Sequence, residues 1–282
     1  MKKSLDINAV LALSGIEEKR KTSLFTEGGY SYFGNPVPRV SNLLKWCFNK
    51  EHLINWASKI TKEEYDMFTK SATTVGTLAH EQIENYLNGE EVIFDHIEID
   101  SYRKLVRTAV ENFVAWHNYF KSQHFYIRPL YIEERIATFW YGGTIDCIAE
   151  ITFPNGYKEN VIIDFKTSKS IGTEYIMQTF AYMWGVNWLR DNGRYTLPKV
   201  SGIMIVRVDK YKKDNYQITF LDENNNMQTF KELEVDLSNM VNWFYSQINL
   251  MDILKVAKAT GKRIMEVDYN GREDSNANSD GD

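Results

Sequence analysis

The sequence predicts an α/β fold in which a central β-sheet is flanked by helices, and three observations support this prediction. Amphipathic patterns with a helical period fill most of the first 124 residues. Runs rich in Ile, Val and Phe follow, and an Asn155-Gly156 step between two of them is typical of a hairpin. A helical pattern returns over 174–189 and is followed by further strand patterns. No linker or internal repeat separates these segments, so we expect one domain.

Local signals place the individual elements. Ser41 is a good N-cap for one helix, and Gly89 suits the end of another because glycine readily adopts a left-handed conformation. In the helical part, about residues 1–124, we expect helices at 5–21, 41–56, 75–89 and 99–123. In the sheet core, about residues 125–222, we expect strands at 125–139, 141–146, 161–167, 200–210 and 216–221, with a helix at 174–189. A C-terminal helix is expected at 237–256, inside a domain that covers 1–270, and the acidic tail 271–282 is expected to be disordered.

Composition excludes several classes of protein. With 43% hydrophobic and 25% charged residues, the chain has the composition of a globular protein. The two cysteines, Cys47 and Cys147, are far apart, which excludes a four-cysteine zinc or iron–sulfur site. No apolar run is long enough to span a membrane, and polar residues interrupt the weakly signal-like start. We therefore expect no membrane partner and a cytoplasmic location, in a bacterial cell or a phage-infected host.

Charge neither supports nor excludes a nucleic-acid partner. The net charge is −5, of which residues 271–282 contribute −3, so the rest of the chain carries only −2. A nearly neutral body can still hold a local basic groove, because binding depends on where the charges lie.

Two acidic residues and a lysine stand out in the central strand patterns. A hairpin of these strands brings Asp146 close to Asp164, and the two-residue period puts Asp164 and Lys166 on the same face. Carboxylates crowded among apolar strands are unfavourable unless they bind something, and a hard divalent cation suits them. By itself, however, Asp164-x-Lys166 is also the pattern of a surface ion pair.

Four motifs in order resemble the PD-(D/E)xK nuclease superfamily, and most closely its RecB-like exonuclease branch, which includes phage exonucleases and the mitochondrial genome-maintenance exonuclease. The motifs are His80-x-x-x-Glu84 after Gly76, Asp146 after Gly143, Asp164-x-Lys166, and Gln178-x-x-x-Tyr182. Residues 37–41 and 53–57 also look like that branch, and the resemblance covers about 36–188. It implies a restriction-endonuclease-like core with a mixed β-sheet, and hydrolysis of DNA.

The resemblance also implies roles for individual residues. Mg²⁺ or Mn²⁺ would be held by His80, Asp146, Asp164 and the Phe165 backbone carbonyl, with Glu84 and Glu134 as further candidates. Glu133 and Glu134 point to opposite faces of a strand, and the sequence does not show which faces inward. Lys166 would orient or deprotonate the attacking water, and Gln178 and Tyr182 would contact substrate or Lys166. In the alternative reading, His80, Gln178 and Tyr182 are packing residues and Glu84 pairs with a lysine.

The expected function is therefore that of a Mg²⁺- or Mn²⁺-dependent deoxyribonuclease, with exonuclease activity favoured. Single-stranded DNA or DNA with free ends is the expected partner, in replication, recombination or repair and with other proteins of those processes. Lys169 and Arg39 are candidates for phosphate contacts, beside Gln178 and Tyr182. The alternatives are a structure-specific or restriction-like endonuclease, and a catalytically inactive nuclease fold that binds DNA or protein.

Overall fold

The computed structural model describes residues 29–33, 35–48, 57–194 and 196–246. The chain divides into two compact units, residues 1–237 and 238–282. The fold below is that of the first unit. In the second unit, the described residues 238–246 are helical, within the helix that the sequence predicts at 237–256. The predicted helix at 5–21 and the acidic tail lie outside the described residues.

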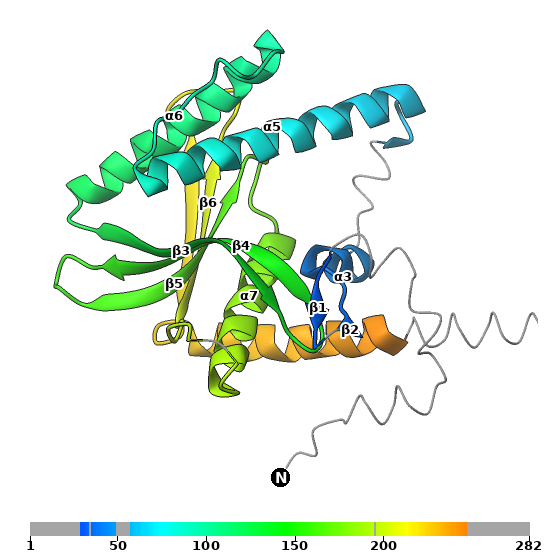
Figure 1. The fold of residues 1–282 in the computed structure, drawn as a ribbon, viewed down its shortest axis with the longest axis vertical. Coiled ribbons are helices and arrows are strands. Elements are labelled where there is room, and N and C mark those ends of the chain that lie inside the picture. The colour runs from blue at the N-terminus through cyan, green and yellow to red at the C-terminus, as the bar shows by residue number, and fades with distance from the viewer. Residues whose placement is uncertain (1–28, 34, 49–56, 195, 247–282) are drawn as a thin grey trace, which may run out of the picture. The chain divides into compact units, whose positions relative to one another are not determined.

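The centre of the first unit is a five-stranded mixed sheet, which confirms the predicted α/β fold class (Figure 1). Its strands, in spatial order, are β3 (Tyr126–Ala137), β4 (Gly142–Thr152), β5 (Lys158–Lys166), β6 (Gly202–Val208) and β7 (Tyr216–Asp222). Neighbouring strands are antiparallel except for β5 and β6, which are parallel. A parallel pair needs a crossover, and helix α7 (Thr173–Asp191) provides it.

The helices cover both faces of this sheet (Figure 1). Helices α5 (Lys62–Asn88) and α6 (Asp100–Ser122) pack on one face, where their apolar residues form a core with Cys147, Ile163 and Met204. Helix α7 packs against β5 and β6 on the other face. In β5, alternation therefore sends Val161, Ile163 and Phe165 toward α5 and α6, and Asp164 and Lys166 toward α7.

Helix α5 begins earlier than the sequence pattern predicts. A capping box starts it, in which Thr61 Oγ1 accepts from the Glu64 N–H and the Glu64 carboxylate accepts from the Thr61 N–H. The predicted C-terminal end is confirmed, since Gly89 is the C-cap with a φ of 74°. The early start was missed because residues 62–74 are nearly all exposed and carry no apolar stripe. Among the described residues no helix is long and apolar enough to cross a membrane.

A short N-terminal segment lies against the start of β4. It contains the hairpin β1 (Ser31–Tyr32) and β2 (Asn35–Pro36), followed by helix α3 (Val40–Cys47). The Gly142 N–H donates to the Pro38 carbonyl, 2.9 Å away, which ties this segment to the sheet. A Cβ at Gly142 would lie 2.6 Å from the Cβ of Tyr30, so only glycine allows the approach.

Candidate metal and catalytic site

The site forms where strands β4 and β5 separate. Their last paired residues are Cys147 and Ile163, so Asp146 and Asp164 are the next residues along the two strands. The ladder hydrogen bond is replaced by a side-chain one, in which the Phe165 N–H donates to Asp146 Oδ2 at 2.7 Å. The sheet thereby brings together two acidic residues that are 18 positions apart in the chain.

His80 and Glu133 join Asp146 from two other elements. One potential ligand atom of each of these three residues lies within 4.8 Å of the others, and His80 Nδ1 is 3.6 Å from Asp146 Oδ1. His80 comes from α5, and its ring packs edge-on against Phe165 with a centroid distance of 6.2 Å. Glu133 comes from β3, where the pairing of Ile132 with Cys147 sets it opposite Asp146. One imidazole nitrogen and two carboxylates are a donor set that suits a divalent cation.

Charges in this group perturb one another. Burial alone would lower the pKa of His80, but the carboxylate of Asp146 outweighs it and raises the pKa. Burial alone would raise the pKa of Asp146, but His80, Lys166 and the Phe165 N–H lower it overall. Partial burial and the carboxylates of Asp146 and Glu84 raise the pKa of Glu133. The carboxylates of Asp146 and Glu84 repel that of Glu133, and a cation bound here would reduce this repulsion.

Asp164 and Lys166 form a buried ion pair on the side of the sheet that faces α7. Lys166 Nζ donates to Asp164 Oδ1 at 2.8 Å and lies 2.7 Å from Oδ2. Oδ2 is buried and has no partner other than the Lys166 ammonium among the described residues, so one of its lone pairs stays open to another ligand. Burial disfavours the ammonium, yet Asp164 and Asp146 raise the pKa of Lys166, and its Nζ lies 5.1 Å from the centroid of the Tyr175 ring. The raised pKa favours the charged ammonium form of Lys166, and the ion pair with Asp164 orients this ammonium.

Gln178 and Tyr182 border the same site from α7. Gln178 Nε2 donates to the Tyr182 hydroxyl at 3.1 Å, and the Tyr182 ring packs where a Cβ at Gly143 would lie, 2.5 Å from its Cε1. Burial, with the nearby carboxylates of Asp164 and Asp146, raises the pKa of Tyr182. Both side chains line a cavity of about 240 Å³ together with Arg39. Three of the predicted substrate-contacting residues thus lie together, while Lys169 is exposed on the loop after β5.

Glu133, rather than Glu134, belongs to the acidic group. The register sets Glu134 opposite Ile145, and adjacent strand residues point to opposite faces, so Glu134 points away from Asp146. The sequence left this choice open, because it shows neither the ends of the turn nor the pairing. In the structure, a four-residue turn between Ala137 and Gly142 sets position 133 opposite position 146. Glu84 lies outside the group of three, but it is near enough to raise the pKa of Glu133.

The backbone carbonyl of Phe165 has the direction that a metal ligand at this site would need. The N–H and C=O of one residue in an extended strand point to the same side, and the Phe165 N–H points to Asp146. The Phe165 carbonyl therefore faces the gap between β4 and β5, where the acidic side chains meet.

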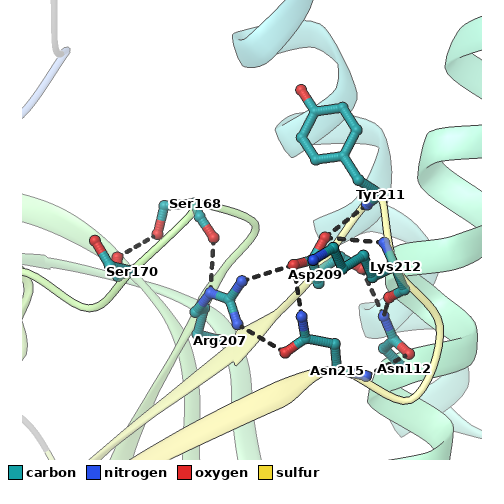
Figure 2. A network of polar contacts seen from close by, with 8 residues as sticks. All are labelled: Asn112, Ser168, Ser170, Arg207, Asp209, Tyr211, Lys212 and Asn215. Atoms are coloured by element: carbon teal, nitrogen blue, oxygen red, sulfur yellow. Dashed lines mark hydrogen bonds and ion pairs between the residues drawn. The ribbon is translucent and has the colours of Figure 1, made fainter.

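A buried polar network holds the loop that follows Lys166, and sequence reasoning missed it (Figure 2). The Arg207 guanidinium donates to the Ser168 carbonyl at 2.9 Å and to Asp209 Oδ2 at 2.9 Å. Asn215 Nδ2 donates to the same Asp209 oxygen at 3.0 Å, and Asn112 of α6 caps the β6–β7 turn by donating to the Asp209 carbonyl. The network fixes the backbone two residues beyond Lys166.

Comparisons with known proteins do not identify a family. The chain matches no protein-family model. It also matches no curated protein. Among solved structures it is similar to the crystal structure of SSO0001, at 14% identity over 59% of this chain and 74% of that chain, with a TM-score of 0.24.

Proposed function

We propose that this protein is a metal-dependent deoxyribonuclease with a restriction-endonuclease-like core. The observation that supports the proposal most strongly is the meeting of Asp146 with Asp164 and Lys166 where β4 and β5 separate. These residues occur in the order of the PD-(D/E)xK motifs. A chance surface ion pair would not place its acid and lysine in a buried position beside a second acid and a histidine.

The donor atoms around Asp146 fit a hard divalent cation. His80, Glu133 and Asp146 would hold Mg²⁺ or Mn²⁺, and Asp164, which lies outside this group of three, and the Phe165 carbonyl are further candidate ligands. A cation bound there supplies positive charge to a phosphate and lowers the pKa of a bound water. Lys166 orients that water and stabilises the charge that develops on the phosphate, because its ammonium is fixed by Asp164.

The remaining groups act on the substrate. Arg39 offers a guanidinium for a phosphate oxygen, and Gln178 and Tyr182 offer an amide and a hydroxyl in the same cavity. DNA with a free end or in single-stranded form is the proposed substrate, and exonuclease activity is favoured over endonuclease activity by the RecB-like order of motifs.

Cleavage of end-labelled DNA tests this function. Wild-type protein is expected to degrade linear substrates with Mg²⁺ or Mn²⁺ and to be inactive with EDTA. Lys166→Ala is expected to lower the rate by at least about 100-fold, as for loss of a positioned proton donor or oxyanion stabiliser. Lys158→Ala is the matched control, because Lys158 lies at the opposite end of the same strand and pairs with Glu150.

Two outcomes would contradict the proposal. Intact linear and single-stranded DNA after incubation with either metal would exclude nuclease activity and leave a binding function. Cutting of a closed circular single strand would exclude a strictly exonucleolytic enzyme and favour the endonuclease alternative.

A further inference from the structure

Two cavities lie beside Tyr30, and only one of them belongs to the site described above. The first is the cavity of about 240 Å³ that Arg39, Gln178 and Tyr182 line. The second, of about 540 Å³, is lined by Phe33, Arg135 and Arg194, among others. Tyr30 lines both cavities. We call the two together the Tyr30 cavities.

Tyr30 is held firmly between them. Its ring is buried and fills the space that the missing Cβ of Gly142 leaves open. Its hydroxyl lies 2.7 Å from Thr144 Oγ1 on β4. Because Gly142 and Thr144 lie four and two residues before Asp146 on the same strand, the Tyr30 cavities have a fixed position relative to the metal and catalytic site.

The Tyr30 cavities are cationic. Arg39, Arg135 and Arg194 line them, and no acidic side chain does. None of the three guanidinium groups forms an ion pair with a carboxylate in the part of the chain that the structure describes. In a protein of net charge −5, three arginines without a carboxylate partner at these cavities favour an anionic ligand.

The same cavities are aromatic, and the guanidinium groups lie over the rings. The Arg135 guanidinium carbon is 4.9 Å from the Tyr30 ring centroid, and that of Arg39 is 5.7 Å from it. The Arg194 guanidinium carbon is 4.7 Å from the Phe33 centroid. Arginine interleaved with aromatic rings is the surface that single-stranded nucleic acids use, since it offers contacts for phosphates and faces for bases.

Phe33 is out of place for folding alone. It is 68% exposed and has a φ of 48°, a left-handed conformation that is unfavourable for a bulky side chain. It begins the two-residue connection between β1 and β2, where Asn, Asp or Gly is the favoured residue. The ring contacts Tyr32 edge-to-face at a centroid distance of 4.6 Å, but most of its surface is exposed in a strained position, so a ligand gives a further reason for its presence.

We propose that the Tyr30 cavities bind a single nucleic-acid strand and guide it to Asp146 and Asp164. Arg39, Arg135 and Arg194 contact its phosphates, and a base stacks on Phe33. Stacking on Phe33 requires an unpaired base, because both faces of a base inside a duplex are covered by its neighbours. This inference rests on the proposed function in that the bound strand is the substrate.

Binding in EDTA separates this inference from cleavage. Anisotropy of a labelled single-stranded oligonucleotide is measured with wild-type protein and with Phe33→Asn. The variant is expected to bind about 5- to 150-fold more weakly, which corresponds to the loss of one base–aromatic stack. Its Tm is expected to be equal or higher, because asparagine tolerates the left-handed conformation. Tyr157→Asn is the control, an exposed aromatic residue at the opposite end of the β4–β5 hairpin, and is expected to bind like wild type.

The charged residues are tested through salt dependence. Arg194→Gln and Arg135→Gln are each expected to reduce the slope of log affinity against log salt by about 0.7, one phosphate contact to a single strand. Arg190→Gln is the matched control, because Arg190 is near Arg194 in the chain but pairs with Asp191 and lines a different cavity. Its slope is expected to equal that of wild type.

Each result decides one of the two proposals. Wild-type affinity in Phe33→Asn and Arg194→Gln, or no binding of the single strand by wild type, would overturn the inference, while metal-dependent cleavage by wild type would leave the proposed function standing. Tighter binding of a blunt duplex through the same residues would also overturn it. Binding that depends on Phe33 and Arg194, with no cleavage in either metal, would support the inference and contradict the proposed function.

Discussion

Asp146 shows at the scale of one residue how the site is held together. Its Oδ2 takes the place of a strand carbonyl for the Phe165 N–H, and its Oδ1 faces His80 on α5. Gly143, three residues earlier, has an equally specific task, since the Tyr182 ring occupies the position of its absent side chain. At both positions a neighbouring group packs closely, the Phe165 N–H at Asp146 and the Tyr182 ring at Gly143. Small changes in side-chain size at either residue are therefore expected to affect stability strongly.

Gly143→Ala is expected to lower the free energy of unfolding by about 1–3 kcal/mol, because the new Cβ overlaps the buried Tyr182 ring. Urea unfolding measures the change. Gly76→Ala serves as the control, since a Cβ there meets only Thr167 Oγ1 at an ordinary 3.6 Å. That substitution in the interior of α5 is expected to stabilise by about 0.5–1 kcal/mol. Equal effects of the two changes would contradict the role given to Gly143.

His117 is expected to make stability depend on pH. It is buried on α6, where its Nδ1 lies 3.0 Å from the Tyr86 hydroxyl, and burial followed by nearby Lys121 lowers its pKa to about 4. The unfolded chain, with an ordinary histidine pKa, then binds more protons between pH of about 4 and about 6.5. The free energy of unfolding therefore falls as the pH is lowered from about 6.5 toward 4, by up to roughly 3 kcal/mol, and the full stability is present above about pH 6.5.

Urea unfolding across that pH range measures the effect. His117→Phe is expected to flatten the dependence, whereas His96→Gln, which changes an exposed loop histidine, is expected to leave it unchanged. If the free energy of unfolding of His117→Phe depended on pH as strongly as that of wild type, the dependence would come from other titratable groups.

At the scale of elements, a side chain of β6 holds the loop that follows β5. Arg207 reaches from β6 to the Ser168 carbonyl beyond β5, and Asp209 and Asn215 complete its hydrogen bonds (Figure 2). Parallel pairing sets Lys166 directly opposite Arg207. The register of two strands thus connects a buried structural network to the lysine of the candidate site.

Arg207→Ala is expected to lower the free energy of unfolding by about 3–5 kcal/mol, because it leaves the largely buried carboxylate of Asp209 without its cation. Arg128→Ala is the control, since Arg128 forms a solvent-exposed pair with Glu150 and its loss is expected to change stability little. Chemical denaturation checks both. A loss no larger than that of the control would show that the network contributes little to the fold.

At the scale of the whole molecule, the candidate site joins helix α5 to the consecutive strands β3, β4 and β5. A ligand that binds these four elements only when they are folded stabilises the fold by mass action. The acidic group around Asp146 is therefore expected to couple metal binding to the stability of the first unit.

Mn²⁺ is expected to raise the Tm of wild-type protein, with stabilisation of about 2.7 kcal/mol when the free ion is at 100 times its Kd. EDTA is expected to reverse the change. Asp146→Asn and Glu133→Gln are expected to reduce the shift, and Glu134→Gln is the neighbouring control that is expected to retain it. If the Mn²⁺-induced rise in Tm were lost in Glu134→Gln and kept in Glu133→Gln, the assignment of Glu133 as the ligand from the β3–β4 register would be wrong.

The sequence by itself predicted the α/β fold class, the order of the main elements and a set of candidate site residues. Apolar periodicity predicted α6, because burial of one face is a local property of the pattern. Helix α7 and strand β6 are buried on nearly all sides, and runs of apolar residues predicted them instead. The tertiary structure decided which residues meet. Glu133 was separated from Glu134 only by the β3–β4 register, and the Arg207 network joins segments up to 103 residues apart. Local patterns report whether a side chain is buried, whereas contacts between distant segments depend on strand pairing and helix packing, which no short stretch of sequence contains.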